Sequence, residues 1–447
     1  MSRSELAEEV NRYLLAATKQ QYDLDRHQIA RYERGEVRWP GAAYRSGLRA
    51  VLGAKSDADL GFTPGRQPSA KPPTTGPDDQ SKGWLPADVV ATAEEMTSQD
   101  VTLSRRQALT SASAALAGTA LTDPLQRWLM PQQTRFQGTS SVSEAELAGW
   151  QQIADQIQGW NNTPTGLLTR KAVIAQLNDV SDRLKDASDG STTRRAFLVG
   201  AELAVIAASM SWDSGSHGAA QRYYTLSVKF AKVAGDENFA AVTLASFARQ
   251  CYDLEQPDDG LELVQLAQYG TRKSASPRLR SLLATREAWS YAKTGKRQSF
   301  RRAVGLAEDH FAEGDANGTD HRRVKKLDEA ELYGVIGARW RDLTAATNNP
   351  KDARHAQDYI SRALALRDQS RVRNHTFDLI GLARTHLITS ELDRASELID
   401  AVLPIAGEWT SGRVGEKLRD FYRESQPFAT STAVHSTREA VRDLIEA

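Results

Sequence analysis

The chain has 447 residues, and its 40% hydrophobic and 26% charged residues are typical of a soluble, folded protein rather than a disordered one. At about 150 residues per domain, this length predicts two or three units. Lysine plus arginine and aspartate plus glutamate number 57 each, so the overall charge excludes no class of partner and must be judged segment by segment.

Residues 1–60 have the pattern of a small helical domain. Ser2 and Glu5 have capping-box spacing, which predicts that a helix begins there. Asp25 is the expected cap of a second helix over 26–34. A further amphipathic helix is expected to close the small core with Tyr44, Leu48, Val51 and Leu52.

The second predicted helix lies in a basic segment, because residues 26–49 contain six arginines and only two glutamates. Arginine can bond a guanine edge and glutamine an adenine edge, so long donors on this helix predict contacts in a DNA major groove. The residues expected to face bases are Arg26, His27, Gln28 and Arg31. Arg34 and Arg38 follow the helix and are expected to contact phosphates, which fix register but not sequence. A solvated basic helix in another kind of helical domain is the alternative interpretation.

A segment rich in proline and glycine follows this head. Residues 61–80 contain five Pro and three Gly, a composition unsuited to a helix or a central strand, so 61–83 is predicted to be a linker. Residues 84–135 are expected to form a helical connector of two helices that ends on an apolar cluster of Leu125, Trp128 and Leu129.

The remaining residues, 143–447, show a repeated pattern of paired helices. Each unit has a small residue on its first helix. Its second helix carries a small residue, then a larger one, then a small or branched one, spaced three or four positions apart. The pattern is carried by Ala208 with Ala220, Tyr224 and Ser227; Ala248 with Gly260, Val264 and Ala267; Ala288 with Phe300, Val304 and Ala307; Ala356, Ile360 and Ala363; and Ala383 with Ala395, Ile399 and Val402. The second-helix positions recur at steps of 40, 40, 56 and 39 residues.

Such a pattern predicts an all-α fold in which a small helix-turn-helix head precedes a TPR-like α-solenoid. Stacked helix pairs bury apolar faces that one pair alone leaves exposed. The repeat is longer than the usual TPR unit of about 34 residues, so the turns are expected to be long. A generic helical bundle with chance periodicity is the alternative, and it leaves the all-α class unchanged.

The run DRHQIARYERGEVRWPGAAYRSGLRAVLGA, residues 25–54, closely resembles the second half of Xre/Cro-type helix-turn-helix domains. The matched features are Ile29, the Glu33-Arg34-Gly35 turn, Pro40 and the apolar stretch 48–52. SRSELAEEVN resembles the helix before the recognition helix. The insertion NRYLLAATKQQYDLD and the TPR-like body after a Pro-rich linker resemble actinobacterial regulators of development and antibiotic production. The resemblance implies that the helix over 26–34 reads bases.

The sequence departs from that family at its start. Such domains open with a helix of about a dozen residues before the Ser-Glu-Leu-Ala segment, and here Met1 falls where that helix has already ended. We therefore expect either a start further upstream or a head that lacks its first helix. A head that lacks this helix has a less completely covered core and is expected to be marginally stable.

The solenoid is expected to offer a concave groove, and such grooves commonly take peptides or protein segments. The candidate groove residues are polar or aromatic side chains on first helices, namely Arg249, Tyr252, Trp289, Tyr291, Arg339, Trp340, Arg384 and His386. Packing between repeats is the alternative role for each aromatic. By analogy with other helix-turn-helix/TPR regulators, we expect a peptide or protein effector, or a body that forms a homodimer.

Several classes of function lack their motifs. The sequence has no phosphate-binding glycine loop, no nucleophile elbow and no H-E-x-x-H, so an enzyme is not expected. Scattered histidines and the single Cys251 predict neither a metal site nor a cofactor. The start has no signal-peptide pattern, and the twin-arginine-like segment 103–121 is too short to span a membrane, so a cytoplasmic protein is expected.

Two hypotheses follow. The first is a sequence-specific DNA-binding transcriptional regulator of development or secondary metabolism, bound to an operator in the nucleoid and gated by its body. The alternative is a TPR-like protein-interaction scaffold or adaptor whose truncated head no longer binds DNA.

Overall fold

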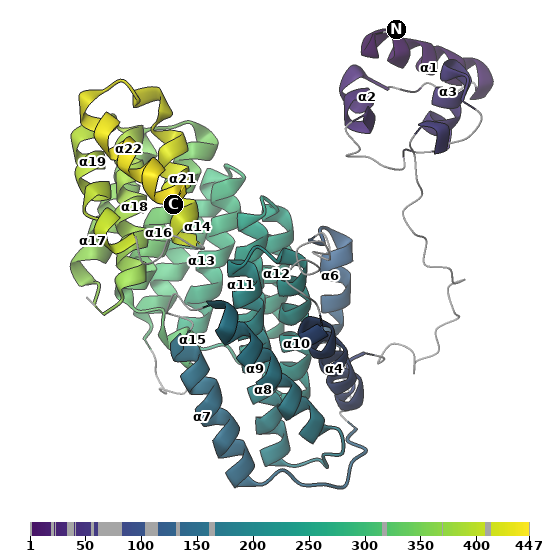
Figure 1. Ribbon diagram of the computed structural model, residues 1–447, viewed down its shortest axis with the longest axis vertical. Coiled ribbons are helices and arrows are strands. Elements are labelled where there is room, and N and C mark those ends of the chain that lie inside the picture. The colour runs from purple at the N-terminus through teal and green to yellow at the C-terminus, as the bar shows by residue number, and fades with distance from the viewer. Residues whose placement is uncertain are drawn as a thin grey trace. The chain divides into compact units, whose positions relative to one another are not determined.

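A computed structural model of the chain is all-α, as predicted (Figure 1). It describes every residue except 1, 19–21, 23, 34–39, 41, 55–57, 61–82, 103–114, 131–134, 161–165, 315–319, 369, 407–412 and 447. Among the described residues, the β pairing is limited to a lone bridge between Ser140 and Ala187. The chain divides into two compact units, Met1–Gln80 and Ser81–Ala447, called here the head and the body. Nearly all of the predicted linker, 61–83, lies outside the described residues.

The head contains α1 (Arg3–Thr18), α2 (Arg26–Glu33), α3 (Ala42–Leu52) and the short η1 (Ala58–Leu60). The predicted capping box is confirmed: the Ser2 amide donates to Glu5 Oε2 at 2.6 Å, and the Glu5 amide donates to Ser2 Oγ at 3.3 Å. The bond from the Ser2 amide is the main reason that the pKa of the Glu5 carboxyl lies below its usual value. The predicted cap of α2 is also confirmed, since the Gln28 amide donates to Asp25 Oδ1 at 2.7 Å.

A small core holds the three helices of the head together. Its buried residues are Ala7, Val10, Leu14, Leu24, Ile29 and Leu48. Helices α1 and α3 approach closely at Gly47, where a Cβ would lie 2.9 Å from Val10 Cγ1. The Asn11 amide fixes the segment before α2, because it donates to the Leu24 carbonyl at 2.8 Å and accepts from the Leu24 amide at 2.9 Å.

The body opens with the predicted connector. It contains α4 (Pro86–Thr102), α6 (Thr119–Gln126) and η3 (Arg127–Leu129). These elements are not a separate spacer, because Trp84, Leu125 and Trp128 are buried in the same core as the helices that follow. The Trp128 ring lies so close to Gly270 that a Cβ there would come within 2.3 Å of it.

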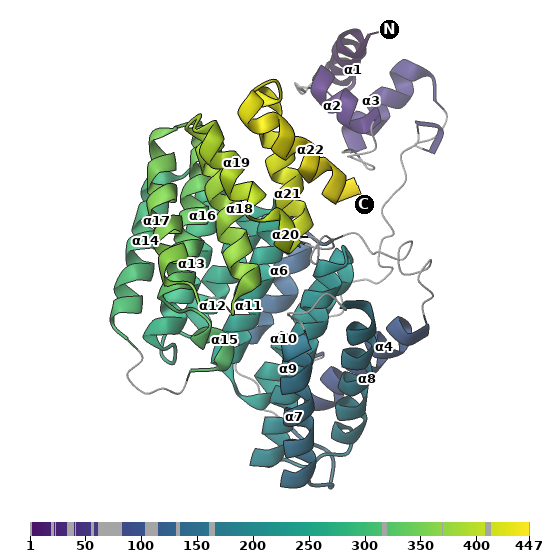
Figure 2. The same cartoon turned by 60° about the vertical axis from the view of Figure 1, so that its left-hand side comes forward.

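Successive helices of the body pack as antiparallel neighbours (Figures 1 and 2). After α7 (Glu144–Trp160) and α8 (Gly166–Leu184), five helix pairs follow: α9 (Ser191–Asp213) with α10 (His217–Ala234), α11 (Glu237–Asp253) with α12 (Pro257–Gly270), α13 (Pro277–Lys293) with α14 (Arg297–Ala312), α16 (Glu329–Thr347) with α17 (Lys351–Leu366), and α18 (Val372–Ile388) with α19 (Leu392–Asp400). The chain ends with α20 (Leu403–Ala406), α21 (Arg413–Glu424), η4 (Gln426–Phe428) and α22 (Thr432–Glu446).

The residues of the repeated pattern lie where these helices meet. All of them are buried, from Ala208 in the first pair to Val402 in the last. The long step of 56 residues between Phe300 and Ala356 has a structural cause. Residues 313–328, which include the short α15 (Arg322–Lys325), come between α14 and α16.

Among the described residues, one helix, α9, is long and apolar enough to cross a membrane. However, 78% of its most apolar stretch is buried inside the body, where α7, α8 and α10 pack around it. Such burial is typical of the central helix of a protein core.

Replacing Gly260 with alanine is expected to destabilise the body by about 1–3 kcal/mol through overpacking. A Cβ at this position in α12 would lie 2.3 Å from Cε1 of the buried Tyr252 ring. Gly305→Ala is the matched control, because no atom lies within 4 Å of its added Cβ. The control is expected to be neutral or slightly stabilising, as alanine is the better helix former. Denaturant midpoints of the three proteins measure both effects, and equal midpoints for Gly260→Ala and wild type would contradict the close approach.

Candidate functional site

Helix α2 of the head presents a basic surface. Arg26, His27 and Arg31 are exposed, while Ile29 and Ala30 on the same helix are buried in the core. Gln28 differs from the other predicted base-contacting residues, because it is half-buried and its Oε1 accepts from the Asp25 amide at 3.3 Å. Arg34 and Arg38, predicted to contact phosphates, lie outside the described residues.

The body contains a pocket of about 150 Å³ built by four first helices, α11, α13, α16 and α18, together with α21. The first helices of consecutive pairs lie side by side, so side chains at equivalent positions converge. The lining includes the cations Arg249, Arg286, Arg339, Arg341, Arg367 and Lys417, the acids Asp253, Glu331 and Asp378, and the aromatics Trp289 and Phe377. This arginine pocket, as it is called below, thus has six cationic and three acidic side chains.

One wall of the arginine pocket is a stack of three side chains. The Arg339 guanidinium carbon lies 3.3 Å from the centroid of the Trp289 ring. Behind it, the Trp289 and Tyr252 rings lie 5.0 Å apart. The buried Tyr252 hydroxyl donates to the Arg286 carbonyl at 2.8 Å. The stack therefore fixes Trp289 and Arg339 against the backbone of α13.

The opposite side of the pocket is a saturated ionic network around Arg367. Its Nε and Nη2 donate to Asp378 Oδ2 at 2.9 and 2.6 Å, and its Nη1 donates to Glu331 Oε2 at 2.8 Å. Asn374 Nδ2 also donates to Glu331 Oε2, at 2.7 Å. Burial alone would raise the pKa of Glu331, but the bonds to Arg367 and Asn374 outweigh it and lower that pKa. Every charge in this part of the pocket therefore has a partner.

Arg286 is the exception. Arg286 is only 8% exposed, and its Nε has no hydrogen-bond partner. Among the described residues no carboxylate forms an ion pair with it, and its Nη1 donates a long hydrogen bond to Thr285 Oγ1 at 3.4 Å. Burial, with the nearby charges of Arg249 and Arg339, lowers the pKa of Arg286 to about 9. A buried cation without an ion-pair partner is costly, and the more distant charge of Glu331 offsets only part of that cost, so this position is electrostatically unsatisfied.

Arg339 is only partly compensated. Its Nη1 lies 3.0 Å from Asp342 Oδ2, and the same carboxylate accepts from Arg341 Nη2 at 2.9 Å. Its Nε is buried without a hydrogen-bond partner. Two guanidinium groups thus share one carboxylate beside Arg286, which leaves this side of the pocket electropositive.

The structure brings three of the eight predicted groove residues, Arg249, Trp289 and Arg339, to the arginine pocket. The other five lie elsewhere, in packing or pairing contacts: Tyr252 behind Trp289, Tyr291 bonded to Glu287, Trp340 packed on Phe300 and His355, Arg384 paired with Asp420 and Glu424, and His386 paired with Glu391.

Among the cations of the pocket, sequence reasoning missed Arg286, Arg341, Arg367 and Lys417. A signal for Arg286 was present, since it lies three residues before Trp289 on the same first helix, one helical turn away. Arg367 and Lys417 lie outside the first helices, at the end of α17 and in α21, and the repeat pattern says nothing about either position.

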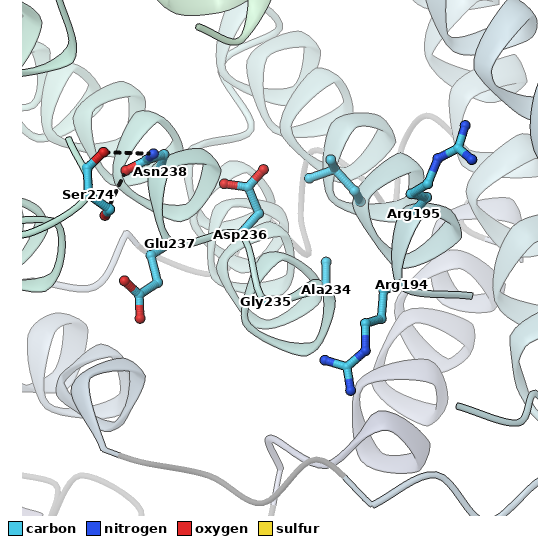
Figure 3. Close-up of a pocket in the computed structure, with 9 residues that line it drawn as sticks. Arg194, Arg195, Ala234, Gly235, Asp236, Glu237, Asn238 and Ser274 are labelled. Carbon is cyan, nitrogen blue, oxygen red and sulfur yellow. Dashed lines mark hydrogen bonds between the residues drawn. The ribbon is translucent and has the colours of Figure 1, made fainter. Parts of the chain in front are cut away.

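A second cavity, of about 370 Å³, opens between α9, α10 and α11 (Figure 3). Most of its polar groups already have partners: Arg194 pairs with Asp189, Asp236 caps α11, and Asn238 bonds Ser274. It therefore offers a ligand fewer unmet polar groups than the arginine pocket does. Within the described residues, no group of His, Cys, Asp or Glu side chains is placed to hold a metal ion.

Comparisons of the chain with protein-family models, with curated proteins and with solved structures found no match. The function must therefore be argued from the head surface and the arginine pocket themselves.

Replacing Arg367 with methionine is expected to destabilise the body by about 3–5 kcal/mol, because it leaves buried carboxylates without their cation. The control is Arg371→Met, whose pair with Asp328 is exposed by 33% and 42% and is expected to contribute about 0–1 kcal/mol.

Denaturant unfolding of the two variants measures the difference. The Arg367→Met defect is expected to shrink as the pH falls and the orphaned carboxylates become protonated. Equal stability of both variants at neutral pH would show that the Arg367 network does not stabilise the fold.

Proposed function

We propose that the chain is a sequence-specific DNA-binding transcriptional regulator of the Xre/Cro type, with a TPR-like body that binds an effector. The observation that carries the proposal is the surface of α2. This helix begins at a capped N-terminus and exposes Arg26, His27 and Arg31, while its other face anchors it to α1. Long cationic donors near the N-terminus of a helix suit the major groove.

The proposal gives the body a sensing role. A stack of helix pairs offers an extended inner surface, and such surfaces bind peptides and protein segments. The arginine pocket, built from four consecutive pairs and α21, supports an effector site on that surface. In this proposal the regulator works in the cytoplasm, bound to its operator in the nucleoid, and its body also serves to form a homodimer.

A protein-interaction adaptor is the second candidate, and the proportions of the chain favour it. The body comprises Ser81–Ala447, whereas the core of the head, in the part that the structure describes, consists of six buried side chains. A domain this small is marginally stable on its own. In this alternative the body binds its partner and the head does not read DNA.

Replacing Arg26 and Arg31 together with alanine is expected to abolish selection of a DNA motif. The measurement is enrichment of genomic fragments by the purified full chain at two salt concentrations. Each guanidinium that bonds a base contributes about 1–3 kcal/mol of discrimination. Binding by the wild type is also expected to weaken steeply with salt, as phosphate contacts release counterions.

The control is Arg394→Ala with Arg442→Ala, which removes the same charge from two exposed, locally paired arginines of the body. This control is expected to select the same motif as the wild type. No enrichment by the wild type at either salt would reject the regulator and favour the adaptor.

A further inference from the structure

The unsatisfied charge of Arg286 calls for an explanation. The residue lies in the middle of α13, where Leu279, Leu283 and Ala288 are buried as ordinary core residues. A methionine of similar length would fill the position without a charge, and replacing buried ions by apolar side chains is often stabilising. A costly charge kept in a pocket is typical of a binding site, where stability is traded for function.

We infer that the arginine pocket binds the anionic group of a ligand, a carboxylate or a phosphate, with Arg286 and Arg339 as its principal donors. The inference rests on the proposed function only in taking the body as the effector-binding unit. Both guanidinium groups have a buried Nε without a partner, and both line the same pocket. Planar guanidinium forks match the oxygen atoms of carboxylates and phosphates.

The acids of the pocket do not already fill this role. Glu331 and Asp378 are bound to Arg367, and Lys417 has Asp420 at 3.6 Å. Asp253 is exposed at the end of α11. Glu331 acts on Arg286 only from a longer distance, so an anion in the pocket would supply the directly bonded negative charge that Arg286 lacks.

The size of the pocket limits what it holds. A volume of about 150 Å³ is comparable to a cavity that accepts benzene, so it takes one anionic group and a few neighbouring carbons. Phe377 offers an apolar surface for those carbons. The ligand is thus a small organic acid or phosphate, or the acidic end of a peptide that continues outside the pocket.

The test is thermal unfolding and calorimetric titration of the full chain, without DNA, at constant ionic strength. The probes are inorganic phosphate, succinate, and an acidic peptide with a free or an amidated C-terminus, with chloride as the reference. At least one probe is expected to raise the melting temperature in a saturable manner. Which of phosphate, succinate and the peptide binds identifies the kind of ligand that supplies the anionic group.

Two variants of Arg286 sharpen the test. Arg286→Met is expected to melt at or above the wild-type temperature without ligand, and to bind the active probe about tenfold to a hundredfold more weakly. Arg286→Lys keeps the positive charge but loses the planar guanidinium group, and is expected to bind the probe with intermediate affinity. Arg194→Met, in the second cavity, is the control and is expected to respond as the wild type does.

Three results would overturn the inference: no saturable response to any probe, an unchanged response in Arg286→Met, or an Arg286→Met protein that is less stable than the wild type or fails to fold. The last would show that Arg286 stabilises the fold. DNA selection is measured separately, so a pocket that binds no anion and a head that reads no DNA are distinguishable failures.

Discussion

A pair of packed helices buries only the faces that meet, and the body of this protein is organised by the need to cover the faces that remain. Small residues at the crossings make this possible. At Gly200 in α9, an added Cβ would lie 2.8 Å from the Phe230 ring of α10. The backbone of α9 and the Phe230 ring are therefore almost in contact. Once each pair is this tight, its outer face is flat enough for the next pair to cover, and the stack extends along the chain.

The same stacking creates an electrostatic conflict. First helices that lie side by side bring equivalent positions together, and in this body several of those positions are arginines. The conflict does not extend to Arg367 at the end of α17, because Glu331 and Asp378 supply the opposite charge there. It is not resolved at Arg286, where the neighbouring charges of Arg249 and Arg339 add to the cost of burial. Packing thus dictates where the charges meet, and the choice of side chains decides whether they are neutralised.

The helix pairs and their contacts were predictable from the sequence, because a small residue at a helix crossing is a local requirement. Ala248 and Ala383 could be assigned to such crossings by spacing alone, and both are fully buried. The arginine pocket was predictable only in part. Arg249, Trp289 and Arg339 share first-helix positions, but a charged residue such as Arg286 is expected on a surface, and its burial depends on helices far along the chain. In the head, capping chemistry identified the start of α2, but the same spacing also makes Gln28 the partner of the Asp25 amide, a capping-box contact that the DNA-binding interpretation of Gln28 did not include.

Repeat arrays usually tolerate the gain or loss of a unit, because each unit contacts only its neighbours. The arginine pocket removes that freedom here. Each of α11, α13, α16, α18 and α21 contributes a different side chain to one small volume. Deleting or duplicating a helix pair between α11 and α21 would shift these contributions out of register even if the helices still packed, whereas the α9–α10 pair contributes none of them. The order of these helices is therefore constrained by the pocket as well as by their packing.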